Sequence, residues 1–308
     1  MAIEQTPPAP GAAAAPVTMP AGGTAARVTE AAPGRLATRI GFVILLLIFT
    51  VIFIYPFIWL MSASLKTTTE VFNNVLIPNP AHPENYSELL DRAPVLTWAW
   101  NSVLVSVLAA TTVTFSSALV AFAFAYFRFP GRNLLFALVL GTLLLPGTIT
   151  MIPNFLIWNK LGFNNSLVPL WAGNLFGSAF YIFLLRQFFL TLPRELFEAA
   201  RVDGANHLRI WWSIAVPLTR AALIVVFVFE LKAAWTELLK PLIFLHDIAL
   251  YTLPRGLKAI VDNPSIGGQK EWELLAAAGV IVTVPMIIVF FLGQRYFLEG
   301  IATTGSKG

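Results

Sequence analysis

Four charged side chains lie inside one strongly apolar stretch of the sequence, at about residues 219–245. They are Glu230, Lys232, Glu237 and Lys240. Charged groups in an apolar environment are costly, so they usually face a polar cavity or a partner. On a continuous helix with about 100° per residue, Glu230, Glu237 and Lys240 would share one face, and Lys232 would not. Two interpretations stay open: these groups lie near a membrane surface or pair with another protein, or they line a path for a polar solute.

Amide and aromatic side chains in the neighbouring apolar stretches could also bind a solute. Five residues of this kind fall there: Asn154, Asn174, Gln187, Trp158 and Trp171. Amides and flat rings suit the hydroxyl groups and faces of sugars, but aromatic residues are also common at membrane surfaces. Asn154 and Asn174 join Glu230 and Glu237 as the predicted solute-pathway residues.

The residues that catalysis or metal binding would need are missing or badly placed. The chain has no cysteine and only three histidines. Ser178 could be the buried nucleophile of an intramembrane protease, but no histidine falls in the same apolar stretch to activate it. The sequence also lacks the G-x-x-x-x-G-K-[S/T] loop that binds nucleotide phosphates. We therefore expect no catalytic residue, no metal site and no ATP bound by this chain.

The composition predicts a helical membrane protein. The chain is 57% hydrophobic and only 12% charged, whereas about a quarter of the residues of a soluble domain are charged. A helix needs roughly 20 apolar residues to cross a bilayer core, and blocks of that length recur. We expect an all-α polytopic membrane bundle of six transmembrane helices, at about residues 39–62, 98–126, 133–153, 168–190, 219–245 and 273–295. Prolines 56, 146, 241 and 285 lie inside spans and would kink them.

The basic residues give these spans an orientation. Of the 20 Lys and Arg residues, twelve fall on one predicted side of the membrane, six on the other and two inside the fifth span. The positive-inside rule places both termini in the cytoplasm, with a polar segment at about residues 191–218. The net charge of +4 therefore reflects orientation and does not indicate nucleic-acid binding. Residues 1–34, rich in Ala, Pro and Gly, should form a disordered cytoplasmic tail, and residues 35–308 the transmembrane domain.

The segment Leu192–Pro217 has the pattern of a helix, a turn and a second helix. Pro193 and Glu195 suit a helix N-terminus, and residues 194–202 contain strong helix formers. Gly204 can take the left-handed backbone conformation that follows such a helix. A second helix is expected at about residues 205–213. Four side chains should face the membrane domain: Phe197, Leu208, Trp211 and Trp212. Four others should be available to a partner: Glu198, Arg201, Asp203 and Arg209.

This segment resembles the EAA motif of binding-protein-dependent ABC importer permeases. The motif reads EAA, three residues, G, nine residues and I-x-L-P. Here it is formed by Glu198-Ala199-Ala200, Gly204, Ile214 and Pro217, with Val216 in place of the usual leucine. Over about residues 40–308 the chain also resembles carbohydrate-uptake permeases of the MalG type. The residues that carry this resemblance are Asn85-Tyr86, Asn101-Ser102, Phe129-Pro130-Gly131-Arg132, Leu161-Gly162, Asp203-Gly204-Ala205 and Tyr251-Thr252-Leu253-Pro254. Thr236 departs from the asparagine that the family usually has between Trp235 and Glu237.

The resemblance implies a type I ABC importer permease fold and a transport function in the bacterial cell (inner or plasma) membrane. The chain would form half of the pathway for a sugar or related polyol. In this family the EAA loop is a coupling helix that inserts into a cleft of an ATPase. The residues implied in coupling are Glu198, Ala199, Ala200, Asp203, Gly204, Ile214 and Pro217. The implied partners are a second permease in a heterodimer, two ATPase subunits that hold ATP and Mg, an extracellular solute-binding protein and membrane lipid.

Two alternative functions stay open from the residues. One is an ABC permease for a solute that is not a sugar. The other is a secondary transporter driven by an ion gradient, which would need no EAA loop and would often show internal repeats.

Overall fold

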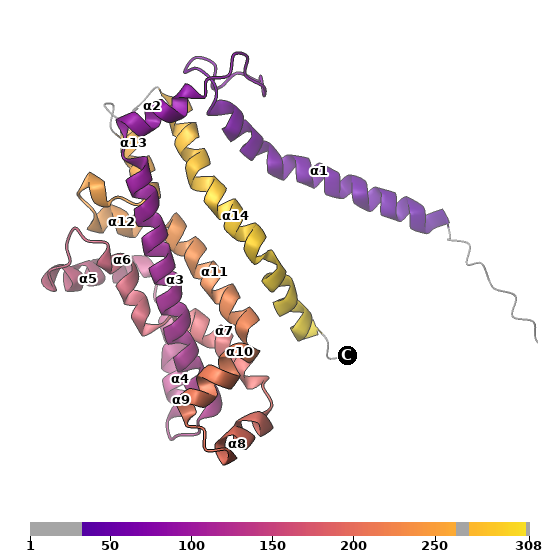
Figure 1. Cartoon of the computed structure of the whole chain (residues 1–308), viewed down its shortest axis with the longest axis vertical. Coiled ribbons are helices and arrows are strands. Elements are labelled where there is room, and N and C mark those ends of the chain that lie inside the picture. Colours follow the sequence, from indigo (N-terminus) through magenta and orange to yellow (C-terminus); the bar gives the residue numbers. More distant parts are fainter. Residues whose placement is uncertain (1–32, 263–270, 306–308) are drawn as a thin grey trace, which may run out of the picture. The chain divides into compact units, whose positions relative to one another are not determined.

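The structure is a computed structural model that describes residues 33–262 and 271–305, and the side chains of residues 38–262 and 271–294. Regular structure in these ranges is helical, as the predicted all-α fold requires (Figure 1). The α-helices are α1 (Pro33–Ala63), α2 (Glu84–Arg92), α3 (Val95–Tyr126), α4 (Arg132–Gly141), α5 (Gly147–Lys160), α6 (Val168–Trp171), α7 (Ala179–Leu190), α8 (Arg194–Val202), α9 (His207–Ile210), α10 (Val216–Leu218), α11 (Arg220–Thr236), α12 (Leu239–Phe244), α13 (Leu253–Asp262) and α14 (Trp272–Gly305). Short 3-10 turns occupy Thr142–Leu144, Ala172–Phe176 and Ile248–Leu250, and a π-helical turn occupies Trp211–Ala215.

The chain divides into two compact units, residues 1–53 and 54–308. The described part of the first unit is the beginning of α1, residues 33–53. α1 contains an apolar stretch, Thr38–Ala63, that is long enough to cross a membrane and matches the first predicted span. The predicted tail, residues 1–34, lies almost wholly outside the described residues, because α1 begins at Pro33.

Three single helices, α1, α3 and α14, are long and apolar enough to cross a membrane. Three further pairs reach that length only together. They are Arg132–Leu144 with Gly147–Lys160, bent by 100°, Val168–Phe176 with Ala179–Leu190, bent by 40°, and His207–Leu218 with Arg220–Thr236, bent by 82°. By length and composition, the described chain therefore has three helices that could span a membrane, or up to six spans if each bent pair is one.

The third predicted span is sharply bent instead of forming one helix. The chain leaves the 3-10 turn Thr142–Leu144 and resumes as α5 directly after Pro146. α5 then continues to Lys160, with Pro153 inside it, so the predicted end at residue 153 was wrong. Proline fits at a helix start because its missing N–H has no partner to lose there.

The fifth predicted span, residues 219–245, is interrupted. α11 ends at Thr236, and α12 begins at Leu239. Pro241 explains the break, because a proline ring clashes with the carbonyl four residues earlier and cannot donate a hydrogen bond to it. That carbonyl belongs to Glu237, the residue that follows α11.

α3 is the central helix of the second unit and packs against α7, α11 and α13 (Figure 1). One buried cluster joins the C-terminal half of α3 to residues of α7, α8 and α11. A second joins its N-terminal half to residues of α11, α12, α13 and α14. Small side chains on α3 let neighbouring helices approach closely. Those that are buried include Ser106, Ala109, Ala110, Ser117, Ala118 and Ala121.

Three side chains near the start of α3 hold the irregular segment between α12 and α13. The Trp98 indole donates to the carbonyl of residue 248 (2.8 Å), and the Asn101 amide donates to the carbonyls of residues 249 and 251 (2.9 and 3.0 Å). The Ser102 hydroxyl accepts the backbone N–H of Leu253 at 2.7 Å. These bonds fix the backbone of this segment, and they connect parts of the chain about 150 residues apart.

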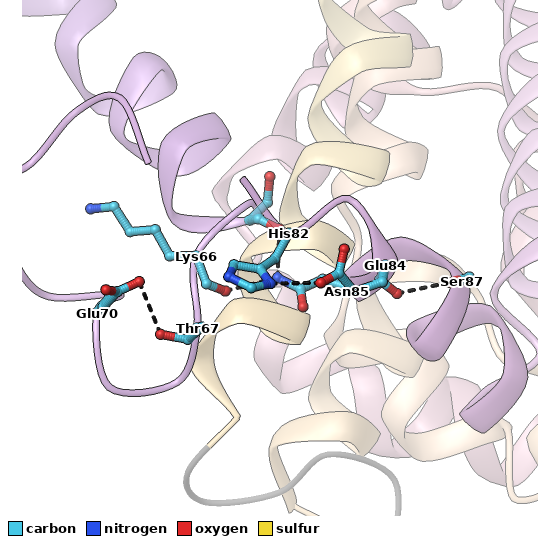
Figure 2. Close-up of polar contacts among 8 residues, drawn as sticks. Lys66, Thr67, Glu70, His82, Glu84, Asn85 and Ser87 are labelled. Atoms are coloured by element: carbon cyan, nitrogen blue, oxygen red, sulfur yellow. Dashed lines mark hydrogen bonds and ion pairs between the residues drawn. The ribbon is translucent and has the colours of Figure 1, made fainter. Parts of the chain in front are cut away.

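The segment between α1 and α2 depends on Asn85 in the same way (Figure 2). Its amide donates to the carbonyls of Ser64 (3.0 Å) and Lys66 (2.9 Å). The Lys66 side chain is buried, and its ammonium donates to a backbone carbonyl at 3.2 Å. His82 Nδ1 lies 2.6 Å from the Glu84 carboxylate, and the pKa of Glu84 is lowered by a backbone hydrogen bond and by this imidazole. Asn85 therefore has a structural role at the start of α2.

Replacing Gly256 by alanine should destabilise the second unit. A Cβ atom at this position in α13 would lie 2.1 Å from the buried Trp98 ring. Because that ring is fully enclosed, we expect Gly256→Ala to cost at least about 2 kcal/mol and to lower the midpoint of thermal unfolding of the purified protein. Gly173→Ala is the matched control, since its Cβ would meet nothing within 4 Å. Equal unfolding midpoints for the two variants would contradict this packing.

Candidate functional site

The first helix of the predicted helix-turn-helix segment is present with the expected bounds, residues 194–202. The turn that follows it contains Gly204, which has φ +78°. The N–H groups of Gly204 and Ala205 donate to the carbonyls of Arg201 (3.0 Å) and Ala200 (2.9 Å). This paired pattern is the Schellman motif, which requires a left-handed residue at the glycine position. Backbone conformation therefore explains this glycine, since a Cβ there would meet nothing within 4 Å.

The second half of the segment differs from the single helix expected at 205–213. α9 covers only His207–Ile210 and is followed by the π-helical turn and by α10. Asn206 caps α9, because its side-chain oxygen accepts the N–H of Arg209 at 2.8 Å. Pro217 lies within α10, and the chain then turns by 82° into α11. The segment therefore joins α11 through a bend.

An aromatic cluster fixes α8 to the membrane-spanning helices. Phe197 is buried, and its ring centroid lies 5.3 Å from that of Tyr126 and 6.1 Å from that of Phe122. The His207 ring of α9 lies 4.9 Å from Phe127. Such pairs contribute about 0.5–1.5 kcal/mol each beyond the area they bury. The segment is therefore attached to the end of α3 through several rings.

The predicted inward face of the segment is only half right. Phe197 and Trp211 are buried, as expected. Leu208 and Trp212 are 64% and 61% exposed, so their inward placement was wrong. For Trp212, the shift from α-helix to π-helix after Ile210 changes the angle between successive side chains, which a regular 3.6-residue period could not anticipate. Leu208 precedes this turn, in the short helix α9.

The outward face carries the charged residues of the motif. Glu198, Ala199, Arg201, Asp203 and Arg209 are exposed, and Ala200 is partly buried. Pro217 is exposed, whereas Ile214 packs against the buried cluster around α3. Val202, at the end of α8, is 88% exposed and was not singled out from the sequence. The only sequence signal for its exposure is its position between two charged residues, Arg201 and Asp203.

A cavity of about 420 Å³ lies beside α8, lined by the ends of α3 and α7 and by α8 and His207. Arg128, Arg194, Arg201 and Glu198 contribute to its wall. None of these four forms an ion pair with another described residue. Three guanidinium groups face one carboxylate, so the surface around α8 is electropositive and suits an acidic partner.

The second candidate site is a smaller cavity of about 230 Å³ between α3, α6, α11 and α12. Glu230, Glu237 and Lys240 all line it, together with Thr252. Asn174 lies beside it, because its amide donates to Glu230 Oε1 at 2.6 Å. Three of the four predicted solute-pathway residues therefore come together. Asn154, on α5, is not part of the cavity lining.

Lys232 lies apart from the other span charges, as its helical position predicted. It lines a different, mainly apolar cavity of about 340 Å³ with residues of α14. Glu230 and Glu237 do not meet through one continuous helix, because α11 ends before Glu237. The Glu237 carboxylate accepts the backbone N–H of Leu239 at 2.8 Å and so helps to start α12. The helix break, and not a continuous helical face, brings Glu237 to the cavity.

Thr252 is the cavity residue that the sequence analysis missed. It is 3% exposed, and its hydroxyl has no hydrogen-bond partner among the described residues. It was noted only as part of a motif, and no residue pattern indicated that its side chain would meet residues of α11. The chain brings it there because its neighbours are held by Asn101 and Ser102.

Comparison with known proteins gives a consistent result. Residues 114–302 match the family described as binding-protein-dependent transport system inner membrane component. The chain is 32% identical over 266 residues to the sn-glycerol-3-phosphate transport system permease protein UgpE of Yersinia enterocolitica, covering 84% of this chain and 94% of that protein. It is 31% identical over 260 residues to the arabinooligosaccharides transport system permease protein AraQ of Halalkalibacterium halodurans, covering 83% and 91%.

The fold also matches a solved structure. A chain in the crystal structure of a bacterial ABC transporter involved in the import of the acidic polysaccharide alginate superposes with a TM-score of 0.75 and 26% sequence identity. The match covers 86% of this chain and 98% of that chain.

Substitutions of Gly204 should separate backbone strain from bulk. Asparagine tolerates the left-handed conformation, whereas valine does not. We expect Gly204→Asn to leave the segment intact and Gly204→Val to cost about 1–2 kcal/mol locally. Hydrogen–deuterium exchange over residues 190–218 would measure this, with faster exchange only in the valine variant. Equally fast exchange in both variants would show that the glycine is needed for another reason.

Proposed function

This chain belongs to the family of inner membrane components of binding-protein-dependent transport systems, and we propose that it is one half of a heterodimeric membrane pathway in an ATP-driven importer. It is a multi-pass membrane protein and a transport subunit, and ATP hydrolysis belongs to a partner ATPase. Under this proposal two ATPase subunits hold ATP and Mg, and this chain binds neither. A second permease, an external solute-binding protein and membrane lipid complete its surroundings.

We place the coupling contact on α8 and the turn at Gly204. The observation that carries this proposal is the contrast between its two faces. Phe197 is buried in the aromatic cluster of α3, while its neighbour Glu198 and the residue after the end of α8, Asp203, are exposed. A short helix with a fixed inner face and a charged outer face suits insertion into a groove of a partner. Because α8 is rigidly attached to α3, α7 and α11, movement of the ATPase would then displace these helices as well.

The proposed coupling residues divide into two kinds. Glu198, Ala199 and Asp203 would touch the ATPase, since they are exposed. Ala200, Gly204, Ile214 and Pro217 would shape the segment, through its turn, its packing and its bend. The arginines in the wall next to α8 would meet acidic groups of the ATPase, whereas the Glu198 carboxylate would meet a basic group.

We propose the orientation that the basic residues predict, with α8 in the cytoplasm. Six spans with both termini on that side would consist of the three single helices, the first two bent pairs and the α11 half of the third pair, with His207–Leu218 in the cytoplasmic segment. In the same proposal residues 1–34 form a cytoplasmic tail and residues 35–308 the transmembrane domain.

A sugar or related polyol is the proposed solute. Relatives named for arabinooligosaccharides and for sn-glycerol-3-phosphate, and a structural match named for alginate import, all concern hydroxyl-rich molecules. The proposed solute path includes Asn174, Glu230 and Glu237, which meet at the smaller cavity. A polyol phosphate is the second candidate, supported by the sn-glycerol-3-phosphate relative. Asn154 has no cavity contact to support a role.

Charge reversal at Glu198 should uncouple the ATPase. We expect Glu198→Lys to reduce co-purification of the ATPase at least about tenfold, because the exposed carboxylate would be replaced by a repelling or unmatched charge. Asp91→Lys, an exposed carboxylate on α2 far from α8 in sequence, is the control and should leave the yield unchanged. Equal ATPase yield from both variants would remove the proposed contact.

Uptake by the assembled transporter should favour carbohydrates. Cells or proteoliposomes that contain the full transporter and its solute-binding protein would be tested with neutral sugars, polyol phosphates and amino acids. We expect uptake of neutral sugars. Uptake of polyol phosphates in their place would favour the second candidate solute. Uptake of amino acids or inorganic ions alone would refute the carbohydrate assignment but leave the coupling proposal standing.

A further inference from the structure

We propose that the cavity formed by Glu230, Glu237, Lys240 and Thr252 is a binding subsite for an uncharged, hydroxyl-bearing group of the solute, and that its carboxylates exclude anions. The inference rests on the proposed transport function and deepens it by naming the solute class.

The Thr252 hydroxyl is the first observation. It is buried, it lines the cavity, and no described residue donates to it or accepts from it. An unpaired buried hydroxyl is unfavourable, and native structures rarely retain one without a partner. The oxygen has almost no accessible surface, so a sugar hydroxyl would reach it after a small side-chain movement and could then both accept from and donate to it. The position is also well fixed, since Asn101 and Ser102 hold the backbone on both sides of Thr252.

The polar groups that remain free in the wall are the second observation. The Lys240 ammonium makes no hydrogen bond or ion pair with any described residue, although two carboxylates share the same cavity. Glu237 uses one oxygen to accept the N–H of Leu239, which leaves the other oxygen available. Free donors and free acceptors around one space suit hydroxyl groups, because each hydroxyl can satisfy either kind.

The balance of charge decides between solute classes. Two carboxylates and one ammonium line the wall, so an entering phosphate or carboxylate would meet more repulsion than attraction. Repulsion of this kind is an effective way for a site to discriminate against anionic solutes. A bare cation would be attracted by the carboxylates but repelled by Lys240, so a neutral hydroxyl-bearing group fits all three charges best.

The size of the cavity limits what it can hold. About 230 Å³ is below the range of about 300–1,000 Å³ that is common for pockets that enclose drug-sized ligands. The site therefore suits a single sugar ring or a small polyol, and only one unit of a longer chain. Asn174 stabilises this arrangement, because its amide donates to Glu230 and to a carbonyl of α3.

The absence of cysteine permits a direct test of the cavity. Thr252→Cys would place the single thiol of this chain in its wall, in the full transporter with cysteine-free partners. Methanethiosulfonate reagents with a trimethylammonium or a sulfonate group would report the local charge. With each rate divided by that reagent's rate with a small free thiol, we expect the cationic reagent to react about tenfold faster, and this preference to fall sharply when Glu230→Gln and Glu237→Gln are added. Equal rates, or no reaction with either reagent while the denatured chain reacts, would overturn the proposal.

Protection of the same thiol would test the solute class. Arabinose and glycerol should slow its modification, whereas glucuronate and sn-glycerol-3-phosphate at the same concentrations should not. Protection by the anions, or by none of the four, would count against the subsite. This assay does not require ATPase coupling. If Glu198→Lys left ATPase co-purification unchanged, the coupling proposal would be refuted and the cavity inference would stand. If the cavity assays failed, the cavity inference would be refuted and the coupling proposal would stand.

Removing the unpaired hydroxyl would distinguish a ligand contact from a structural role. Thr252→Val should leave the purified transporter equally or more stable without sugar, because no internal hydrogen bond is lost. It should weaken the sugar-dependent rise in unfolding temperature, with an apparent affinity reduced about fivefold. Thr114→Val is the matched control, since Thr114 also has a buried unpaired hydroxyl but does not line the cavity. An identical sugar response in both variants would show that Thr252 contacts no solute.

Discussion

Backbone polar groups at membrane depth must find hydrogen-bond partners within the protein, because lipid offers none. This chain has several breaks in its apolar helices, and α3 supplies many of the partners. Ser117 accepts the N–H of Ser178 at 3.0 Å, at the start of α7, and Asn101 and Ser102 serve the segment before α13. The small polar side chains of α3 therefore make an interrupted bundle possible, and they also let neighbouring helices pack closely around it.

The two candidate sites use these breaks differently. At one end of α3, the aromatic cluster around Phe197 attaches α8 firmly, so the exposed Glu198 moves with the helices beneath it. In the bundle, the break before Pro241 leaves Glu237 outside α11, where it caps α12 and faces the cavity. A rigid coupling surface and a charged cavity thus connect to the same central helix. Solute binding at the cavity and movement of α8 can therefore be linked through the packing of α3.

The sequence alone predicted the features that depend on local chemistry. Apolar block length indicated a helical membrane protein, and helix formers followed by Gly204 predicted α8 and its turn with the observed bounds. Helical periodicity separated Lys232 from Glu230. It failed where regular geometry ends, at the π-helical turn that exposes Trp212 and at the break that interrupts the fifth span.

Tertiary structure decided which distant residues meet. The short motifs at Asn85 and Asn101-Ser102 were visible as a resemblance, but only the fold shows that their side chains hold backbone segments far away in the chain. The same bonds bring Thr252 to Glu230 and Glu237, and they leave Asn154 outside that cavity. A sequence determines local conformation through the preferences of each residue. Contacts across about 150 residues depend on how helices pack, which no local pattern records.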